Sequence, residues 1–225
     1  MNLYQDPRHI VDLSHRVHPD MQTFPVDWHK KVEFEKLGTL QEVGRNTTQV
    51  HIGTHSGTHI DAPSHFLELG KSISDFEIST FLGEATYFDL SFLKPKDVIS
   101  VDVLERVLAG RICSRILIFN LGWSSRYGSG SYYSDQPFFN NESAEWILAK
   151  KPKLIGYDIA MPDDPLDGRS SDCDSPMHKK FMHDDILLLE NLNISESLPL
   201  EFFLIALPMN LDGLDGSPVR CVGIF

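Results

Sequence analysis

Apolar and polar residues alternate with a period of two in several short stretches of the chain, and this alternation predicts β-strands. The stretches with this pattern are residues 9–14, 32–38, 47–53 and 85–91. Short continuous apolar runs predict buried strands, and they occur at residues 115–121, 153–158 and 186–189. The last part of the chain, residues 202–225, predicts two more strands joined by a turn-rich loop. Strands therefore dominate the expected fold.

Only two segments have a helical pattern. Residues 95–108 form the first, which is ended by Gly110, and residues 142–150 form the second, with Asn141 as its cap. Polar loops are expected at residues 122–136 and 161–177. Because few helices are mixed among the strands and no Gly-rich phosphate loop is present, the pattern favours an α/β or α+β fold rather than a doubly wound nucleotide-binding fold. With no repeat or linker, residues 1–225 are expected to form a single domain.

The composition is that of an ordinary globular protein, with 41% hydrophobic and 23% charged residues. The chain has 20 Lys and Arg against 32 Asp and Glu, a net charge of −12, so we expect neither a nucleic-acid partner nor an anionic membrane partner. No stretch has the length of the apolar region of a signal peptide or of a membrane span, which favours a cytoplasmic location. The three cysteines lie far apart and are expected to be reduced thiols.

The densest chemical signal is a histidine cluster at residues 51–65. Four of the ten histidines and Asp61 fall within these fifteen residues. Imidazole and carboxylate groups are the usual ligands of Zn²⁺, Mn²⁺ and Fe²⁺, so the cluster predicts a metal site. His55, His59 and Asp61 are close enough in sequence for one sharply bent segment to deliver three ligands, and the intervening glycine permits such a bend. His51 is the weakest candidate, because it also fits a strand that leads into the loop.

A second stretch, residues 178–192, mixes two histidines and three carboxylates with apolar residues. Glu190 ends the apolar run 186–189, where a buried carboxylate needs a cation or a metal ion as its partner. A carboxylate at the exposed end of a strand is an equally good interpretation of this pattern. The pattern alone leaves both possibilities open.

The segment from His55 to Phe66 closely resembles the HxGTHxDxPxHF signature of the metal-dependent cyclase/hydrolase family that includes bacterial kynurenine formamidase and isatin hydrolase. Weaker matches follow in the same order along nearly the whole chain. They include residues 12–14, 121–124, 154–158, 190–192 and 215–220. Their shared order argues against a chance similarity.

This resemblance implies a fold, an assembly and a set of metal ligands. Family members adopt a swivelling β/β/α-like α/β fold with a mixed β-sheet core and few helices, and they assemble as dimers or larger oligomers, so we expect a homodimer or a higher homo-oligomer. The positions that match the ligands of the family are His55, His59, Asp61, His178 and Glu190, with Asp61 bridging to a second ion in two-zinc members. Single-metal members of the isatin-hydrolase type have glutamine in place of Glu190, so the glutamate favours the formamidase-like arrangement.

The resemblance also implies roles for His65 and Phe24. His65 matches the general acid/base of the family, and Phe24 occupies the position of a substrate-contacting tryptophan in formamidases. Phenylalanine keeps the flat apolar surface of that residue but lacks the indole N–H. The implied activity is hydrolysis of a small-molecule amide, an aryl formamide such as N-formylkynurenine, by a metal-activated water with proton transfer through His65.

Other functions fit the same sequence. One alternative opens a lactam or lactone, or cyclises a polyketide-like chain, and the loops around Phe24 and residues 122–136 would decide between such substrates. Another is a metal-binding module without turnover, but a structural site needs four closing ligands and no spare base such as His65. The implied cofactor is a divalent metal, with one or two ions per chain. Histidine-rich ligation favours Zn²⁺, and the carboxylates also suit Mn²⁺.

Overall fold

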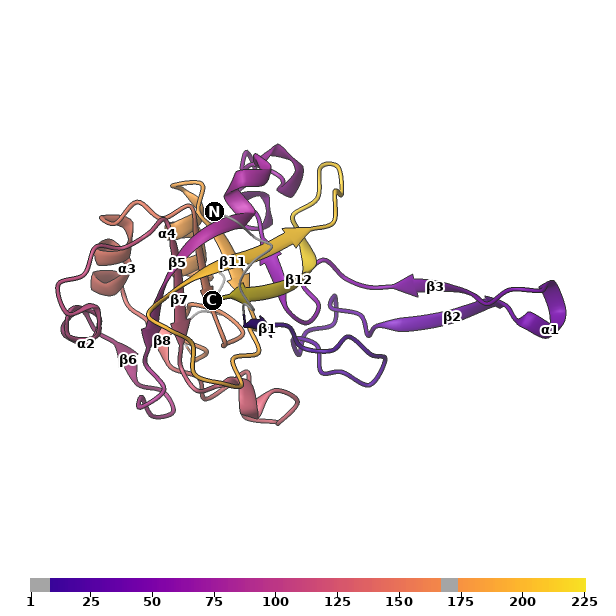
Figure 1. Cartoon of the computed structure of the whole chain (residues 1–225), viewed down its shortest axis with the longest axis horizontal. Helices are drawn as coiled ribbons and strands as arrows, with labels where there is room; N and C mark the ends of the chain where they lie inside the picture. Colours follow the sequence, from indigo (N-terminus) through magenta and orange to yellow (C-terminus); the bar gives the residue numbers. More distant parts are fainter. Residues whose placement is uncertain (1–8, 167–173) are drawn as a thin grey trace.

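The computed structural model describes residues 9–166 and 174–225 of the chain. Its main element is a mixed eight-stranded sheet that forms a barrel-like core (Figure 1). In spatial order, the strands are β1 (Ile10–Asp12), β12 (Gly216–Ile224), β11 (Glu201–Pro208), β5 (Leu82–Asp89), β7 (Ile116–Asn120), β9 (Leu154–Tyr157), β10 (Leu187–Glu190) and β4 (His59–Asp61). The strands β5, β7, β9 and β10 run parallel to one another, and the other pairs are antiparallel. An additional antiparallel pairing between β12 and β4 closes the sheet on itself.

The central strands are buried on both faces, which explains their continuous apolar sequences. Alternate residues of a strand point to opposite faces of the sheet. In β7, Ile116 and Ile118 point into the barrel and pack with residues of β4, β11 and β12. Leu117 and Phe119 point outward, into the core that the helices cover. All four side chains are fully buried.

Three helices pack against the outer core: α2 (Val101–Leu108), α3 (Asn141–Leu148) and α4 (Pro176–Met182) (Figure 1). The helix α2 begins after Ser100, whose side chain accepts a hydrogen bond from the backbone N–H of Val103. The helix α3 begins after Asn140, whose side chain is bonded in the same way to Ser143. The helix α4 has Pro176 at its start and receives no capping bond from the side chain of its own N-cap residue. Its first N–H groups therefore need a partner from elsewhere in the chain.

A long hairpin projects away from the barrel (Figure 1). It consists of β2 (Glu33–Gly38), β3 (Thr47–His51) and the one-turn helix α1 (Leu40–Val43) at its tip. We call residues 33–51 the arm. The remaining described elements are the small ribbon of β6 (Val98–Ile99) with β8 (Phe138–Phe139), and the 3-10 turns η1 (Pro63–His65), η2 (Ile73–Asp75), η3 (Ile78–Phe81) and η4 (Ser124–Arg126).

The predicted fold class is confirmed. The chain has the expected swivelling α/β architecture with a mixed sheet, and its described residues form four α-helices. Every strand predicted from alternation or from an apolar run is present, although its ends are shifted. The helix expected over 95–108 begins only at Val101, because Ser100 caps it, and the cap of the next helix is Asn140 rather than Asn141.

Two elements that build the site had no clear signal in the sequence. The strand β4 has three residues, which are too few to show an alternating pattern, and they lie inside the histidine cluster. The helix α4 falls partly in the loop expected over 161–177, and its residues lack a local capping motif. Residues 167–173 of that loop lie outside the described part of the chain.

Cys113 and Cys221 are free thiols, as predicted, and Cys173 lies outside the described residues. Burial raises the pKa of the Cys221 thiol, so this group stays protonated. Among the residues that the structure describes, no helix has the length and hydrophobicity that crossing a bilayer requires.

Gly70 lies where the chain after His65 turns back on η1. A Cβ at this position would lie 2.4 Å from the carbonyl carbon of Pro63 and 2.6 Å from the backbone nitrogen of Ser64. Because these are backbone atoms, they cannot move aside without shifting the turn. We expect Gly70→Ala to lower the free energy of unfolding by about 1–3 kcal/mol, measured by chemical denaturation.

Gly130→Ala is the matched control for this substitution. Nothing lies within 4 Å of a Cβ built on Gly130, so the added methyl group meets no neighbour. Equal unfolding free energies for the two variants would contradict the close approach of Gly70 to η1.

Candidate active site

The candidate site lies at the seam where β4 meets β10 and β12. His59 and Asp61 are the first and last residues of β4, so their side chains point to the same face of the strand. Glu190, at the end of β10, lies opposite His59 in the antiparallel register. The loop before β4 contributes His55, and η1 contributes His65. The closure of the barrel therefore brings these side chains together.

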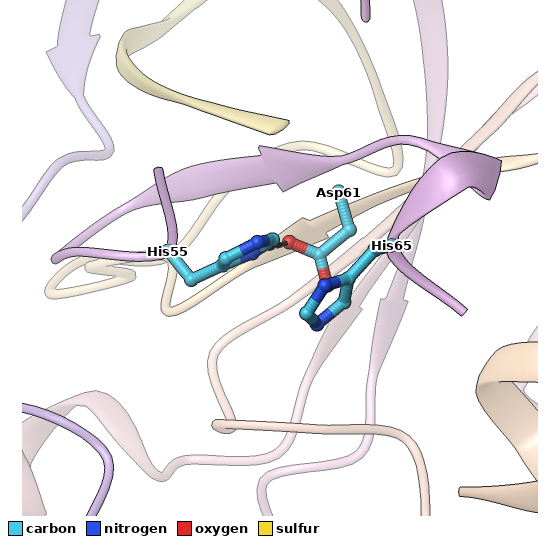
Figure 2. Close-up of side chains that lie close together, drawn as sticks. All are labelled: His55, Asp61 and His65. Carbon is cyan, nitrogen blue, oxygen red and sulfur yellow. Dashed lines mark hydrogen bonds and ion pairs between the residues drawn. The ribbon is translucent and has the colours of Figure 1, made fainter. Parts of the chain in front are cut away.

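Asp61 is at the centre of this group. Its residue is 1% exposed, and three imidazoles surround its carboxylate. Oδ1 lies 2.6 Å from Nδ1 of His55 and 3.1 Å from Nε2 of His59, and Oδ2 lies 3.8 Å from Nε2 of His178. Figure 2 shows His55 and His65 approaching the carboxylate from different sides. Burial alone would raise the pKa of Asp61, but the adjacent imidazoles of His55 and His59 hold it well below its usual range.

Hydrogen bonds from the surrounding chain fix the orientations of His59 and His178. Nδ1 of His59 donates to the carbonyl oxygen of Gly57 at 2.8 Å, which leaves Nε2 facing the buried carboxylates. Nδ1 of His178 donates to the carboxylate of Asp163 at 2.5 Å, which leaves Nε2 3.2 Å from Oε1 of Glu190. A metal-binding histidine is held in this way, because a bond to one ring nitrogen directs the lone pair of the other toward the ion.

Asp163 also holds the first turn of α4. Its buried carboxylate accepts hydrogen bonds from the backbone N–H groups of Met177, at 2.6 Å, and His178, at 3.2 Å. These bonds take the place of a local N-cap. The same carboxylate therefore starts the helix and orients the imidazole that the helix carries.

Glu190 is 4% exposed, which excludes the exposed strand end as an interpretation of its position. The hydroxyl of Tyr157 donates to Oε1 at 2.8 Å, and Oε2 lies 3.6 Å from Nε2 of His59. The Nε2 atoms of His59 and His178 thus lie 3.1 to 3.8 Å from the nearest carboxylate oxygens of Asp61 and Glu190, whereas Nδ1 of His55 lies closer to Asp61, at 2.6 Å. Ligand atoms of a tetrahedral zinc site lie about 3.4 Å apart, so the donor set fits a divalent cation.

Asp61 belongs to two groups of ligand atoms. Atoms of His55, Asp61 and His65 lie within 4.8 Å of one another, and so do atoms of His59, Asp61 and Glu190. Asp61 is common to both groups, so its carboxylate can contribute to two neighbouring cation positions. These groups differ from the ligand set that the resemblance implies, because His65 is close enough to Asp61 to count among the ligands.

Asp215, in the loop before β12, joins His55 to His65. Its Oδ2 accepts a hydrogen bond from Nε2 of His55 at 2.7 Å and lies 3.4 Å from Nδ1 of His65. The two imidazole rings stack with their centroids 3.8 Å apart. Hydrogen bonds to these two histidines hold the pKa of Asp215 far below its usual range. One anionic side chain thus anchors both rings.

The carboxylates also change the protonation of the histidines. Burial alone would lower the pKa of His55, but Asp61 and Asp215 raise it to about 10. Burial likewise opposes the charge on His178, but Asp163 raises its pKa to about 10. Both imidazoles therefore carry a proton at neutral pH that a metal ion must displace, so metal binding weakens as the pH falls.

These side chains form the floor of a cavity of about 730 Å³. Its walls include the aromatic residues Phe24, Trp28, Phe66 and Tyr133. Phe24 packs edge-on against Tyr133, with ring centroids 5.4 Å apart. Small-molecule sites typically enclose about 300–1,000 Å³ and combine apolar walls with a few polar groups. The cavity therefore has the size and lining to take a small aromatic molecule above a charged floor.

The structure gathers at this cavity all six residues that the sequence indicates as ligands or as the acid/base: His55, His59, Asp61, His65, His178 and Glu190. Phe24 lies in its wall. His51, the weakest candidate, is exposed on β3 and lies 3.3 Å from Glu35 instead.

Asp163, Tyr157, Asn191 and Asp215 also hold the site, but the sequence did not indicate them. The side-chain N–H of Asn191 donates to the carbonyl oxygen of Gly57 at 3.1 Å, beside the bond from His59. Asp215 and Asn191 lie in segments that match the family, but no local pattern connects them to the histidines. Asp163 lies in a polar loop that gives no such signal.

Both the sequence and the fold are similar to those of known proteins. Residues 11–164 match the Cyclase family model, which is described as "Putative cyclase". The chain belongs to the cyclase family. Among its relatives, a kynurenine formamidase from Bacillus cytotoxicus is 32% identical over 214 residues, which cover 94% of this chain and 95% of the relative. A kynurenine formamidase from Bacillus anthracis is 31% identical over 219 residues, with the same coverage.

Solved structures share the fold of this cyclase-family chain. Isatin hydrolase A from Ralstonia solanacearum superposes with a TM-score of 0.85 at 21% identity, covering 96% of this chain and 92% of the other. An isatin hydrolase bound to the product analogue thioisatinate gives a TM-score of 0.84 at 21% identity, covering 97% and 92% of the two chains. At this level of identity, the comparison establishes the fold alone.

Asp163→Asn removes the negative charge that orients His178 but keeps a polar side chain of the same size. We expect the affinity for Zn²⁺ to fall by about 10–100-fold, because the hydrogen-bond partners of metal-binding histidines typically contribute this much. Isothermal titration calorimetry of the metal-free protein measures the change.

Asp164→Asn is the matched control. The carboxylate of Asp164 accepts a hydrogen bond from the backbone N–H of Leu166 at 2.8 Å and does not line the cavity. Equal Zn²⁺ affinities for the two variants would show that Asp163 does not support a metal ligand.

Proposed function

We propose that this chain is a divalent-metal-dependent hydrolase that cleaves an aryl formamide, such as N-formylkynurenine, into formate and an aryl amine. The observation that carries the proposal is the convergence of five ligand side chains on a charged floor, with His65 beside them, beneath apolar walls. The formamidases that are 31% and 32% identical to this chain over 94% of its length support this class of reaction. The ligands in the proposal are His55, His59, Asp61, His178 and Glu190.

The chemistry divides between the ion and His65. A divalent cation held by the ligand group supplies a Lewis acid, which makes water more acidic and polarises an amide carbonyl. His65 accepts a proton from the water that adds to the formyl carbon, and it delivers this proton to the nitrogen as the C–N bond breaks. Because an aryl amine is a poor leaving group as an anion, this protonation is needed for the bond to break.

Asp215 keeps His65 in the orientation that the proton transfer requires. Its carboxylate lies 3.4 Å from Nδ1, which favours the tautomer with the proton on Nδ1 and leaves Nε2 as the proton acceptor. The same carboxylate holds His55 at 2.7 Å. Asp215 is therefore a positioning residue for one ligand and for the acid/base together.

The aryl part of the substrate lies against the apolar walls in this proposal. The ring of Phe66 contacts His65 and His178, with centroid distances of 4.4 Å and 4.6 Å, so the apolar wall reaches the charged floor. Phe24, also in the wall, presents a ring without a hydrogen-bond donor. Recognition at Phe24 would therefore depend on stacking and shape.

Zn²⁺ is the metal that we propose first. Three imidazoles in the ligand set favour zinc, whereas the two carboxylates also suit Mn²⁺. Asp61 is shared between two groups of ligand atoms, which supports up to two ions per chain.

The proposed function is tested on protein purified without added metal. We expect the absorbance change that accompanies N-formylkynurenine cleavage, its loss on chelation, its return with Zn²⁺, and about two metal equivalents by elemental analysis. His65→Ala is expected to retain its metal and to lose turnover by about 10²–10⁴-fold, because proton transfer contributes this much.

His51→Ala is the control for this variant, since His51 is an exposed histidine outside the cavity. If the protein binds metal but does not hydrolyse N-formylkynurenine, the proposed formamide substrate is wrong, and lactams and lactones are the next substrates to assay. Full turnover by His65→Ala would overturn its acid/base role.

Asp215→Asn tests whether this carboxylate positions the acid/base. We expect kcat for N-formylkynurenine to fall roughly 10–100-fold. We expect a much smaller loss for an aryl formate ester with a good leaving group, because such a group departs without protonation. Steady-state kinetics on the two substrates, with metal content measured in parallel, provides the comparison.

Asp212→Asn serves as the control, because Asp212 is an exposed carboxylate on the same loop. If Asp215→Asn loses the same factor on the amide and on the ester, the residue has a structural role and the positioning role is wrong.

A further inference from the structure

The wall of the cavity contains one basic side chain, that of Lys179. This residue lies on α4 directly after His178, and it is the one lysine or arginine among the described residues that line the cavity. Its side chain is partly buried. A cation at this place is informative, because the chain as a whole carries a net charge of −12.

Lys179 has no charged partner of its own. Among residues 9–166 and 174–225, no carboxylate forms an ion pair with its ammonium group, and no group accepts a hydrogen bond from it. The adjacent Lys180, by contrast, pairs with Glu145. An ammonium group that is partly removed from water without a partner costs free energy. In a binding cavity, such a group is available to a ligand.

The carboxylates of the floor do not need this cation. Asp61 lies 2.6 Å from Nδ1 of His55, and Glu190 lies 3.2 Å from Nε2 of His178. Neither carboxylate is within ion-pair distance of Lys179. The charge of Lys179 is therefore left for a molecule that occupies the cavity.

The helix places Lys179 beside the floor rather than in it. Successive residues of an α-helix point about 100° apart around the helix axis. Because the ring of His178 faces Glu190, the side chain of Lys179 leaves α4 along the neighbouring wall. A substrate whose formamide group lies at the floor has its far end near the walls, where the long and flexible lysine side chain can reach it.

The same wall restricts which anion fits. Asp174, which precedes α4, also lines the cavity, and its exposed carboxylate accepts a hydrogen bond from the hydroxyl of Ser175 at 3.1 Å. The segment therefore presents one charge of each sign. Asp174 would repel a phosphate dianion, whereas a single carboxylate matches the single ammonium group of Lys179. An α-amino acid group, with one carboxylate and one ammonium, matches both charges.

We infer that Lys179 binds a carboxylate of the substrate and makes the site selective for aryl formamides that carry this group. The inference rests on the proposed function and adds the substrate feature that the cavity wall recognises. N-formylkynurenine has such a carboxylate, at the end of a side chain on its aryl ring. Lys179 is a specificity-determining residue in this arrangement, because it contacts a part of the substrate that takes no part in bond cleavage.

Two substrates that differ only in the carboxylate test this inference. N-formylkynuramine is N-formylkynurenine without its carboxylate group. We expect the unchanged protein to cleave N-formylkynurenine with a kcat/KM about 10–100-fold higher, because a hydrogen bond between charged groups contributes this much. We expect Lys179→Met to remove this preference. The loss should appear in KM, with kcat changed by less than about threefold, because the carboxylate is held equally before and during the reaction.

Lys180→Met is the matched control, because Lys180 pairs with Glu145 and does not line the cavity. We expect it to keep the preference, and we expect Lys179→Arg to keep it as well, since arginine retains the charge. A Lys179→Met variant that loses the same factor on both substrates has lost structural support at α4, and the inference is then wrong. It is also wrong if Lys179→Met keeps the preference or if the unchanged protein has none.

Binding of the amine products separates this inference from the proposed reaction. If neither formamide is cleaved, the proposed function is wrong, but the carboxylate site can still be measured. Isothermal titration calorimetry of the zinc-loaded protein compares kynurenine with kynuramine, which lacks the carboxylate. We expect the unchanged protein to bind kynurenine more tightly and Lys179→Met to bind the two equally. Equal affinities in the unchanged protein would overturn the inference, whatever its activity.

Discussion

The site depends above all on the burial of Asp61. A carboxylate removed from water costs several kcal/mol unless positive charge and hydrogen bonds surround it. His55 and His59 supply these partners at 2.6 Å and 3.1 Å. Each imidazole must in turn be prevented from rotating away, and bonds to Asp215 and to the carbonyl oxygen of Gly57 hold the outer ring nitrogens. The buried charge, its histidines and the groups that orient them therefore form a single unit, whose electrostatics suit a bound cation.

Closure of the barrel determines where this unit lies. Asp61 is paired with Leu188 on one side and with Gly216 on the other, so β4 joins two segments of the sheet that are far apart in the sequence. A Cβ on Gly216 would lie 2.6 Å from the carbonyl oxygen of Ile60 and 3.1 Å from Cε1 of His55. The glycine thus lets β12 approach both the strand and the imidazole. Contacts that close the sheet also position His55, so damage to the seam would affect stability and site together.

Sequence patterns predict the parts of this molecule that local chemistry determines. Apolar runs indicate the central strands because these are buried on both faces, and the density of ligand side chains marks the segment around Asp61. The patterns miss Asp163, which caps α4 from a position 14 residues before Met177, and Asp215, which reaches His55 across 160 residues of sequence. Such long-range partners leave no local periodicity. Glu190 is predictable only in part. The sequence shows that it ends an apolar run, but its burial depends on the register of β10 against β4, which the sequence does not show.

The floor and the walls of the cavity come from different parts of the fold, and this separation bears on substrate choice. The floor is built largely from β4, β10 and α4, with His55 from the loop before β4 and His65 from η1, and replacing one of its buried charged residues leaves a partner buried and unpaired. The walls come largely from loops, including residues 22–29 and Tyr133, and loop residues can change without disturbing those charges. A floor suited to amide hydrolysis can therefore be combined with walls that suit different aryl groups. Under the proposed function, Phe24 would select by shape and stacking, and the range of substrates would depend on residues 22–29 and Tyr133 rather than on the charged residues of the floor.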